Sequence, residues 1–230
     1  LERVNSRLRA ANQLATDLIA MLSHDLRQPL TTIIGYTEML ADDKDPDSGQ
    51  QRRALERTHA AARQLQQLVE DVLVMAQSDA GVMPTRPARV AVSESLRASL
   101  STLAISVDDV EVDQPVEAYA QVDPGHLRQI LTNLIGNAFK YGARPVQVTV
   151  ATAPRTVEIR VSDHGRGVPQ EFVPQIFDRF TRAANGVAQG TGLGLYIVRQ
   201  LTLVNGGSVH YEPRQPHGST FVVRLPSSSR

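Results

Sequence analysis

Residues 129–141 read QILTNLIGNAFKY, a stretch whose apolar and polar residues recur with the period of an amphipathic helix. Asn133 and Asn137 stand four apart and share one helix face, and Lys140 projects from the same side. An amide oxygen suits a hard magnesium ion that also holds phosphate oxygens, and an ammonium group neutralises phosphate charge. The stretch therefore predicts a nucleotide clamp on a helix; the alternative is that these polar residues simply face water.

Two glycine-rich loops follow this helix. In DHGRGVP, residues 163–169, Gly165 and Gly167 permit a tight turn close to a planar ligand, and Asp163 can accept a hydrogen bond from an exocyclic amine such as adenine N6. In GTGLGL, residues 190–195, the chain opens a helix whose backbone N–H groups can cradle phosphates. The positions of this second loop are Gly190, Thr191, Gly192, Leu193, Gly194 and Leu195. It is not a Walker loop or a Rossmann fingerprint, and residues 183–190 before it are expected to act as a lid.

Short β-rich runs surround these motifs. We expect strands over residues 146–151, 156–162, 208–212 and 220–225, and helices over residues 93–103, 124–141 and 193–204. This mixture predicts an α/β sandwich with helices on one sheet face. The domain is expected to occupy residues 88–230, after a linker at residues 81–87.

Residues 1–80 have a different, helical character and are expected to form a hairpin whose turn lies at residues 42–49. Each arm carries an apolar stripe with alternating steps of four and three. The stripes are Leu26, Leu30, Ile33, Thr37 and Leu40 on the first arm, and Ala62, Leu65, Val69, Val72 and Ala76 on the second. Because such a hairpin buries little by itself, two copies are expected to pair into a dimeric four-helix bundle.

His24 lies two positions from both Leu22 and Leu26, about 200° from that apolar row, and should face solvent. An ordinary surface histidine is the simpler interpretation. Its neighbours favour a nucleophilic role for His24, because Asp25 can orient the imidazole or take its Nδ1 proton so that Nε2 attacks phosphorus. Pro29 removes a helical hydrogen bond and should bend the chain just beyond the histidine.

The composition excludes several function classes. The 230 residues are 41% hydrophobic, which supports a buried core, and 24 basic residues balance 24 acidic ones, so no bulk charge favours nucleic acid as a partner. Cysteine is absent, which removes disulfides and thiol chemistry. No apolar run approaches the roughly 20 residues that span a bilayer. Without an initiating Met, the sequence is expected to be a fragment of a longer protein.

The order of these elements resembles the histidine kinase family over nearly the whole chain. Residues 23–30 look like its H box, 133–140 like the N box, 163–167 like the G1 box, 176–180 like the F box and 190–195 like the G2 box. The resemblance implies an ATP-binding fold of the gyrase, Hsp90 and histidine kinase type. It also implies ATP and Mg²⁺ as cofactors, a response regulator receiver domain as partner, and a cytoplasmic core whose relatives are often membrane-anchored upstream.

Carried over from the family, His24 is the phospho-acceptor with Asp25 beside it, and Asn137 is the magnesium ligand. Asn133 and Lys140 are implied to contact the phosphate region and Asp163 to anchor adenine. Tyr141 would flank the nucleotide, while Phe177 and Phe180 would pack at the lid hinge.

Two departures from the family pattern stand out. Gln28 occupies the position, four residues after the histidine, where relatives commonly carry Thr or Asn, which puts phosphatase activity toward the partner in doubt. The lid between residues 182 and 190 is also short beside many relatives.

Two other functions compete with a kinase. ATPases of the gyrase and Hsp90 type place a glutamate four residues before the magnesium-binding asparagine to activate water, whereas this chain has Asn133 there. Transfer to a tethered imidazole needs mainly positioning and charge neutralisation, which these residues supply. A catalytically silent dimeric scaffold is the second alternative, against which the intact set of motif residues argues.

Overall fold

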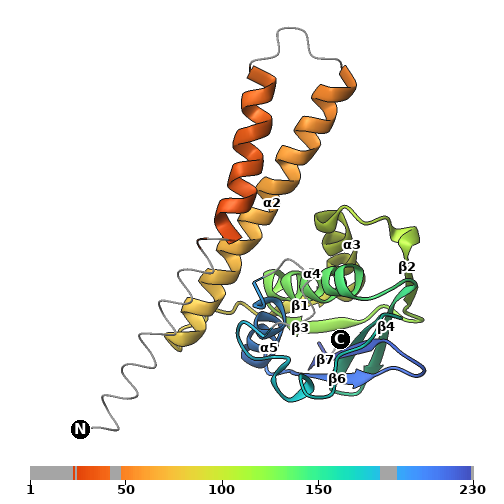
Figure 1. Ribbon diagram of the computed structural model, residues 1–230. Coiled ribbons are helices and arrows are strands. Elements are labelled where there is room, and N and C mark those ends of the chain that lie inside the picture. The colour runs from red at the N-terminus through yellow and green to blue at the C-terminus, as the bar shows by residue number, and fades with distance from the viewer. Residues whose placement is uncertain (1–22, 24, 42–47, 182–190, 229–230) are drawn as a thin grey trace. The chain divides into compact units, whose positions relative to one another are not determined.

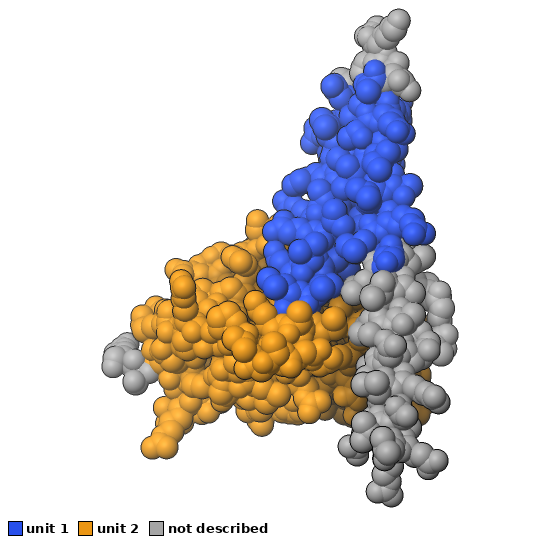
Figure 2. Space-filling view, turned by 90° about the vertical axis from the view of Figure 1, so that its left-hand side faces the viewer, with its two compact units in different colours: residues 1–73 blue, residues 74–230 orange. Residues whose placement is uncertain are grey.

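The structure, a computed structural model, describes residues 23, 25–41, 48–181 and 191–228. They fall into two compact units, residues 1–73 and residues 74–230, which are coloured separately in Figure 2. Among the described helices, none is both long and apolar enough to cross a membrane.

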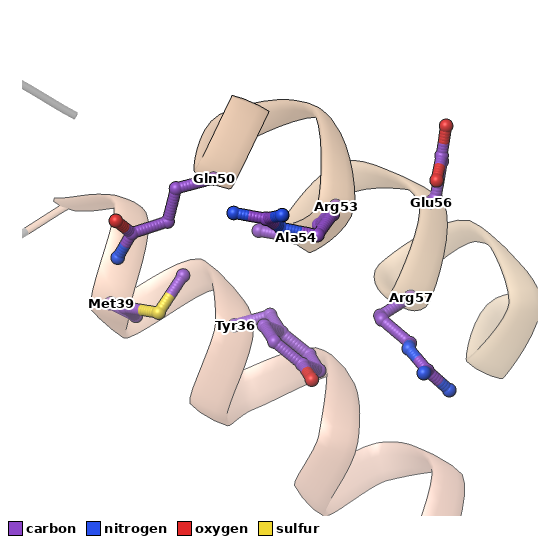
Figure 3. A pocket seen from close by; sticks show the side chains of 7 residues that line it. All are labelled: Tyr36, Met39, Gln50, Arg53, Ala54, Glu56 and Arg57. Atoms are coloured by element: carbon purple, nitrogen blue, oxygen red, sulfur yellow. The ribbon is translucent and has the colours of Figure 1, made fainter. Parts of the chain in front are cut away.

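Unit 1 contains two helical arms, residues 25–41 and most of α2 (Ser48–Asp79) (Figure 1). The buried apolar positions of α2 in this unit recur every seven residues, at Ala54, Ala61 and Leu68, which are 1%, 6% and 8% exposed. That repeat is the spacing of packed helices, and small alanines at two of the three positions allow close approach. A cleft of about 340 Å³ opens between the arms beside Tyr36 and Ala54 (Figure 3) and contains none of the predicted site residues.

The predicted apolar stripes are only partly correct. On the first arm Leu26, Ile33 and Leu40 are half-buried, whereas Leu30 and Thr37 are exposed. On α2, Leu65 and Val72 are half-buried, whereas Ala62, Val69 and Ala76 are exposed. The reason is that each helix carries two adjoining apolar stripes one residue apart, and spacing alone does not tell which of them faces the other arm.

Unit 2 is built on a five-stranded sheet with the order β2-β4-β5-β7-β6, in which only the β2–β4 pair is parallel. Its strands are β2 (Val110–Asp113), β4 (Val146–Ala153), β5 (Thr156–Ser162), β6 (Ser208–Pro213) and β7 (Ser219–Pro226). Alternate residues of β5, namely Val157, Ile159 and Val161, point into the core and are at most 1% exposed.

Three helices cover one face of this sheet, so the predicted sandwich is confirmed (Figure 1). They are α3 (Val92–Leu103), α4 (Pro124–Tyr141) and α5 (Gly194–Val204), and short 3₁₀ helices span Val107–Asp109 and Val173–Gln175. The start of α4 is set by Asp123, whose carboxylate accepts hydrogen bonds from the N–H groups of Gly125 and His126, and by Pro124 in its first turn.

A second sheet was not predicted. It pairs β1 (Ala88–Ala91) with β3 (Tyr119–Val122) in antiparallel register, so residue 88, expected to open the domain, begins a strand. These strands and β2 have only four residues each, too few for a period-2 pattern to stand out.

The last turn of α2 belongs to unit 2. Val74 and Met75 are each 9% exposed and join the hydrophobic core of that unit. Asp79 forms a two-point ion pair with Arg179, and Ser78 Oγ donates to Gln200 Oε1 at 3.0 Å. The Arg179 guanidinium also donates to Tyr196 Oη at 2.8 Å. The hydrogen bond with Asp79 raises the pKa of Arg179, which therefore keeps its charge.

The sheet face opposite the helices carries a chain of ionisable side chains that pair with one another. His210 pairs with Glu212, Glu212 with Arg160, Arg160 with Glu158, and Glu158 with Arg224. Val222 lies in register between Arg160 and His210 on this face and is nonetheless fully buried, because these long side chains cover it.

This network predicts a pH-dependent stability. Hydrogen bonds from His210 and Arg160 lower the pKa of Glu212 from its ordinary value of 4.5, so the folded state binds the proton less readily than the unfolded chain. The contribution of Glu212 should be complete above pH 4.5 and disappear as the pH falls through the lowered pKa. Urea unfolding between pH 7 and pH 3 should show that the free energy of unfolding falls less steeply with decreasing pH in Glu212→Gln than in wild type. The exposed Glu171→Gln is the control, and equal slopes for Glu212→Gln and wild type would contradict the assignment.

Candidate functional site

The polar face of α4 carries the first group of predicted site residues. Asn133 and Asn137 are half-buried, one turn apart, while Ile130, Leu134 and Ile135 behind them are completely buried. Lys140 Nζ lies 5.3 Å from the ring centroid of Tyr141, whose side chain is 53% exposed. The core thus fixes α4 and aims its two amides outward.

The start of α5 lies directly beside these two amides. A Cβ atom added at Gly194 would lie 3.0 Å from Asn133 Oδ1 and 3.9 Å from Asn137 Nδ2. No described side chain caps the first turn of α5, so its backbone N–H groups and the positive end of the helix are available to an anion. The N-box and G2-box residues therefore form one group in space.

The loop before α5 has little freedom at its described end. Gly192 has a φ of +69°, and an added Cβ would lie 2.8 Å from the backbone carbon of Phe180, so only glycine fits. Phe180 N donates to Gly192 O at 3.0 Å, and Leu193 N donates to the buried Thr191 Oγ1 at 3.2 Å. The described ends of the F box and of the G2 box are thus held together by backbone contacts.

Asp163 follows β5 and is 5% exposed. Its backbone N–H donates to Ser219 O at 2.9 Å, and its Oδ1 accepts from Gly165 N at 2.7 Å. An added Cβ at Gly142, the residue that ends α4, would lie 2.5 Å from the Asp163 side chain. The end of the N-box helix is therefore packed against the G1 turn.

Glycines close this turn on both sides. On one side, a Cβ at Gly165 would lie 2.7 Å from Gly142 Cα. On the other, a Cβ at Gly167 would lie 3.0 Å from Gly218 O, and one at Gly218 would lie 2.1 Å from Asp163 O. The G1 turn, residues 163–168, is thus held between the end of α4 and the β6–β7 connection, and side chains there would displace it.

One polar atom is left unsatisfied at the site. Among the residues that the structure describes, Asn133 Nδ2 is buried and finds no hydrogen-bond acceptor. A buried donor without a partner costs about 1–3 kcal/mol. A phosphate oxygen would satisfy it, and the adjacent Asn137 supplies the kind of amide oxygen that Mg²⁺ accepts, so these residues fit a magnesium nucleotide.

The electrostatics at the start of α4 stabilise the helix itself. Burial raises the pKa of Asp123, but hydrogen bonds from the backbone N–H groups of Arg86, His126 and Gly125 lower it by more, so the carboxylate stays ionised. Burial lowers the pKa of His126 despite the nearby Asp123.

Not every predicted site residue can be placed. His24 and Gly190, with the predicted lid at residues 183–190 and most of the predicted hairpin turn, lie outside the described residues. Asp25 is half-buried on the first arm of unit 1. Phe177 packs edge-on against Phe221, with ring centroids 6.3 Å apart.

The structure adds residues that the motifs did not indicate, namely Gly142, Tyr211, Gly218 and Ser219. All four contact the G1 turn but lie 21 to 56 residues from Asp163 along the chain. The only sequence signal was a glycine directly before a strand or directly after a helix, which is common in turns.

Comparison with known families matches both parts of the chain. Residues 14–81 match the His Kinase A (phospho-acceptor) domain, and residues 122–229 match the Histidine kinase-, DNA gyrase B-, and HSP90-like ATPase family.

Two curated relatives match nearly the whole of this chain. Signal transduction histidine-protein kinase AfsQ2 of Streptomyces coelicolor is 33% identical over 98% of this chain, and Sensor protein DivL of Caulobacter vibrioides is 37% identical over 97%. The chain spans 44% and 29% of these two relatives. Among solved structures, full-length ShkA in complex with AMPPNP is 27% identical, with a TM-score of 0.63 over 93% of this chain and 46% of that one.

Proposed function

The chain belongs to the histidine kinases and contains their catalytic core, and on that premise we propose that it phosphorylates itself on His24 with ATP. The phosphoryl group then passes to an aspartate of a response regulator. One observation carries the proposal. The two amides of α4 lie beside the uncapped start of α5, the buried Asp163 packs against the end of α4, and Asn133 Nδ2 has no hydrogen-bond acceptor among the described residues.

Each group of the site has a role in holding the nucleotide. The Asp163 carboxylate accepts a hydrogen bond from the adenine amine, and Tyr141 flanks the nucleotide. The backbone of residues 190–195, Asn133 and Lys140 would bind the phosphates, and Asn137 would hold Mg²⁺. When bound, the metal ion neutralises the charge that develops on the transferred phosphoryl group.

The chemical step takes place on the imidazole. His24 Nε2 attacks the γ-phosphorus, and a P–N bond forms as the bond from that phosphorus to the bridging oxygen breaks and ADP leaves. Asp25 takes the Nδ1 proton, so that the phosphoimidazole is neutral at that nitrogen. A carboxylate oxygen of the regulator then attacks the same phosphorus as the P–N bond breaks, and Asp25 returns the proton to Nδ1, so that His24 leaves as a neutral imidazole.

We propose that the chain is organised in three parts for this phosphoryl transfer. Residues 1–80 form the phospho-acceptor hairpin, residues 81–87 the connection, and residues 88–230 the nucleotide module. We place this core in the cytoplasm.

A second copy of the chain completes unit 1 in this proposal. Five large apolar side chains of the two arms are 46% to 57% exposed in the single chain, namely Leu30, Ile34, Leu55, Val69 and Leu73. Such a set is costly in water and has the helical spacing of a packing stripe, so a homodimer that buries it as a four-helix bundle is the favoured state.

Val69→Glu should therefore weaken the dimer at least about a hundredfold, because it places a charge in the buried stripe. Sedimentation equilibrium of wild type and variant measures the dissociation constant. Gln64→Glu, at an exposed position of α2 outside the stripe, should leave the dimer unchanged. A monomeric wild type, or a Val69→Glu protein as dimeric as wild type, would refute this interface.

The proposed activity is tested by incubating the chain with γ-labelled ATP and Mg²⁺. Label should enter the protein, be lost under mild acid and survive alkali, which is the behaviour of phosphorus bonded to nitrogen. Label that resists acid, or no label in a protein that is folded and dimeric, would overturn the proposal.

A further inference from the structure

The G1 turn is supported by a residue from a distant strand. Val168, the last residue of the turn, donates its backbone N–H to Tyr211 Oη of β6 at 3.2 Å. The same hydroxyl lies 3.7 Å from where a Cβ of Gly167 would be. Gly167 has a φ of +73°, so the turn passes through a left-handed conformation directly before this hydrogen bond.

The Tyr211 ring is itself held in place. It packs against Phe221 of β7 with ring centroids 5.6 Å apart and an angle of 55° between the planes. Phe221 in turn meets Phe177 edge-on, with an interplanar angle of 87°. Because tilted and edge-on aromatic pairs are favourable geometries, the hydroxyl is presented to Val168 from a fixed position.

We propose that Tyr211 is a positioning residue for adenine recognition. Asp163 begins the turn and Val168 ends it. Asp163 is fixed by Ser219 O and Gly165 N, and the Tyr211 hydroxyl fixes the other end. With both ends held, the Asp163 carboxylate keeps one orientation toward an exocyclic amine. The inference rests on the proposed function and names a residue outside the family motifs that sets nucleotide affinity.

The role is confined to the adenine end of the site. Tyr211 contacts residues 167–168 and Phe221, whereas the amides of Asn133 and Asn137 lie beside Gly194. Loss of the hydroxyl should therefore weaken binding of the base and leave binding of the phosphates unchanged.

The test uses Tyr211→Phe in the full chain, with a fluorescent ADP analogue displaced by adenosine, ADP or tripolyphosphate. Adenosine and ADP should each bind about fivefold more weakly than to wild type, the effect of losing one neutral hydrogen bond of about 1 kcal/mol. Tripolyphosphate should bind equally well. The KM for ATP should rise by the same factor while kcat for self-labelling stays constant. Tyr119→Phe on β3, a tyrosine of the other sheet, is the matched control and should change none of these values.

Amide hydrogen exchange at Val168, measured without nucleotide, tests independently whether the Tyr211 hydroxyl holds the end of the G1 turn. The Val168 amide should exchange faster in Tyr211→Phe than in wild type, when both proteins are measured well below their melting temperatures. Unchanged exchange, unchanged adenosine affinity, or an equal loss of adenosine and tripolyphosphate would overturn the inference. A wild type that binds no adenine nucleotide would overturn the proposed function as well.

Discussion

Replacing His24 with Gln is expected to abolish self-phosphorylation, with a loss of at least about a thousandfold in the rate of labelling from ATP. The amide of Gln has no nitrogen lone pair able to attack phosphorus, whereas its helix propensity and size leave the first arm intact. Binding of ADP should not change, because the nucleotide residues all belong to unit 2. Labelling by γ-labelled ATP and a parallel ADP titration give the two readouts.

The matched control is His59→Gln, an exposed histidine of α2 that lies outside every motif. It should label at the wild-type rate. Persistent label in His24→Gln, or loss of label in both variants, would contradict the assignment of the phospho-acceptor.

Asn137→Asp is expected to have the second-largest effect, a loss of about a hundredfold in affinity for the magnesium nucleotide and of nearly all labelling. The substitution keeps the size of the side chain but adds a negative charge next to Asn133 and the start of α5, where the phosphates are proposed to bind. Like charges at a partly buried contact cost several kcal/mol. Calorimetric titration with ADP and Mg²⁺ measures the change.

Gln175→Glu makes the same amide-to-carboxylate change at an exposed position of unit 2 and should bind as wild type does. Both variants should remain dimeric. An Asn137→Asp protein that binds the magnesium nucleotide with wild-type affinity would remove Asn137 from the site.

Much of unit 2 was predictable from local signals. The bounds of α4 were predicted correctly because Asp123 and Pro124 start the helix and its periodicity is strong. The four longer strands were found from their β-branched residues, with ends differing by at most two residues. The shortest strands, β1, β2 and β3, are stabilised by pairing with distant segments, which a local pattern does not contain.

The site was predictable as a set of motifs but not as an arrangement. The types and spacing of Asn133, Asn137 and Asp163 indicated their chemistry before any geometry was known. The support of the G1 turn by Gly142, Gly218 and Tyr211 depends on close backbone approaches between three separate elements. Those approaches follow from the order of the strands in the sheet, which no single segment encodes.

The central claim is that the nucleotide held by unit 2 delivers its γ-phosphoryl group to one imidazole nitrogen. Fragmentation mass spectrometry of the wild-type chain, digested and kept at neutral to alkaline pH after reaction with ATP and Mg²⁺, tests it most directly. The account predicts one phosphorylated peptide, with the added mass on His24. Phosphate located on a serine, a threonine or another histidine, with His24 unmodified, would contradict it.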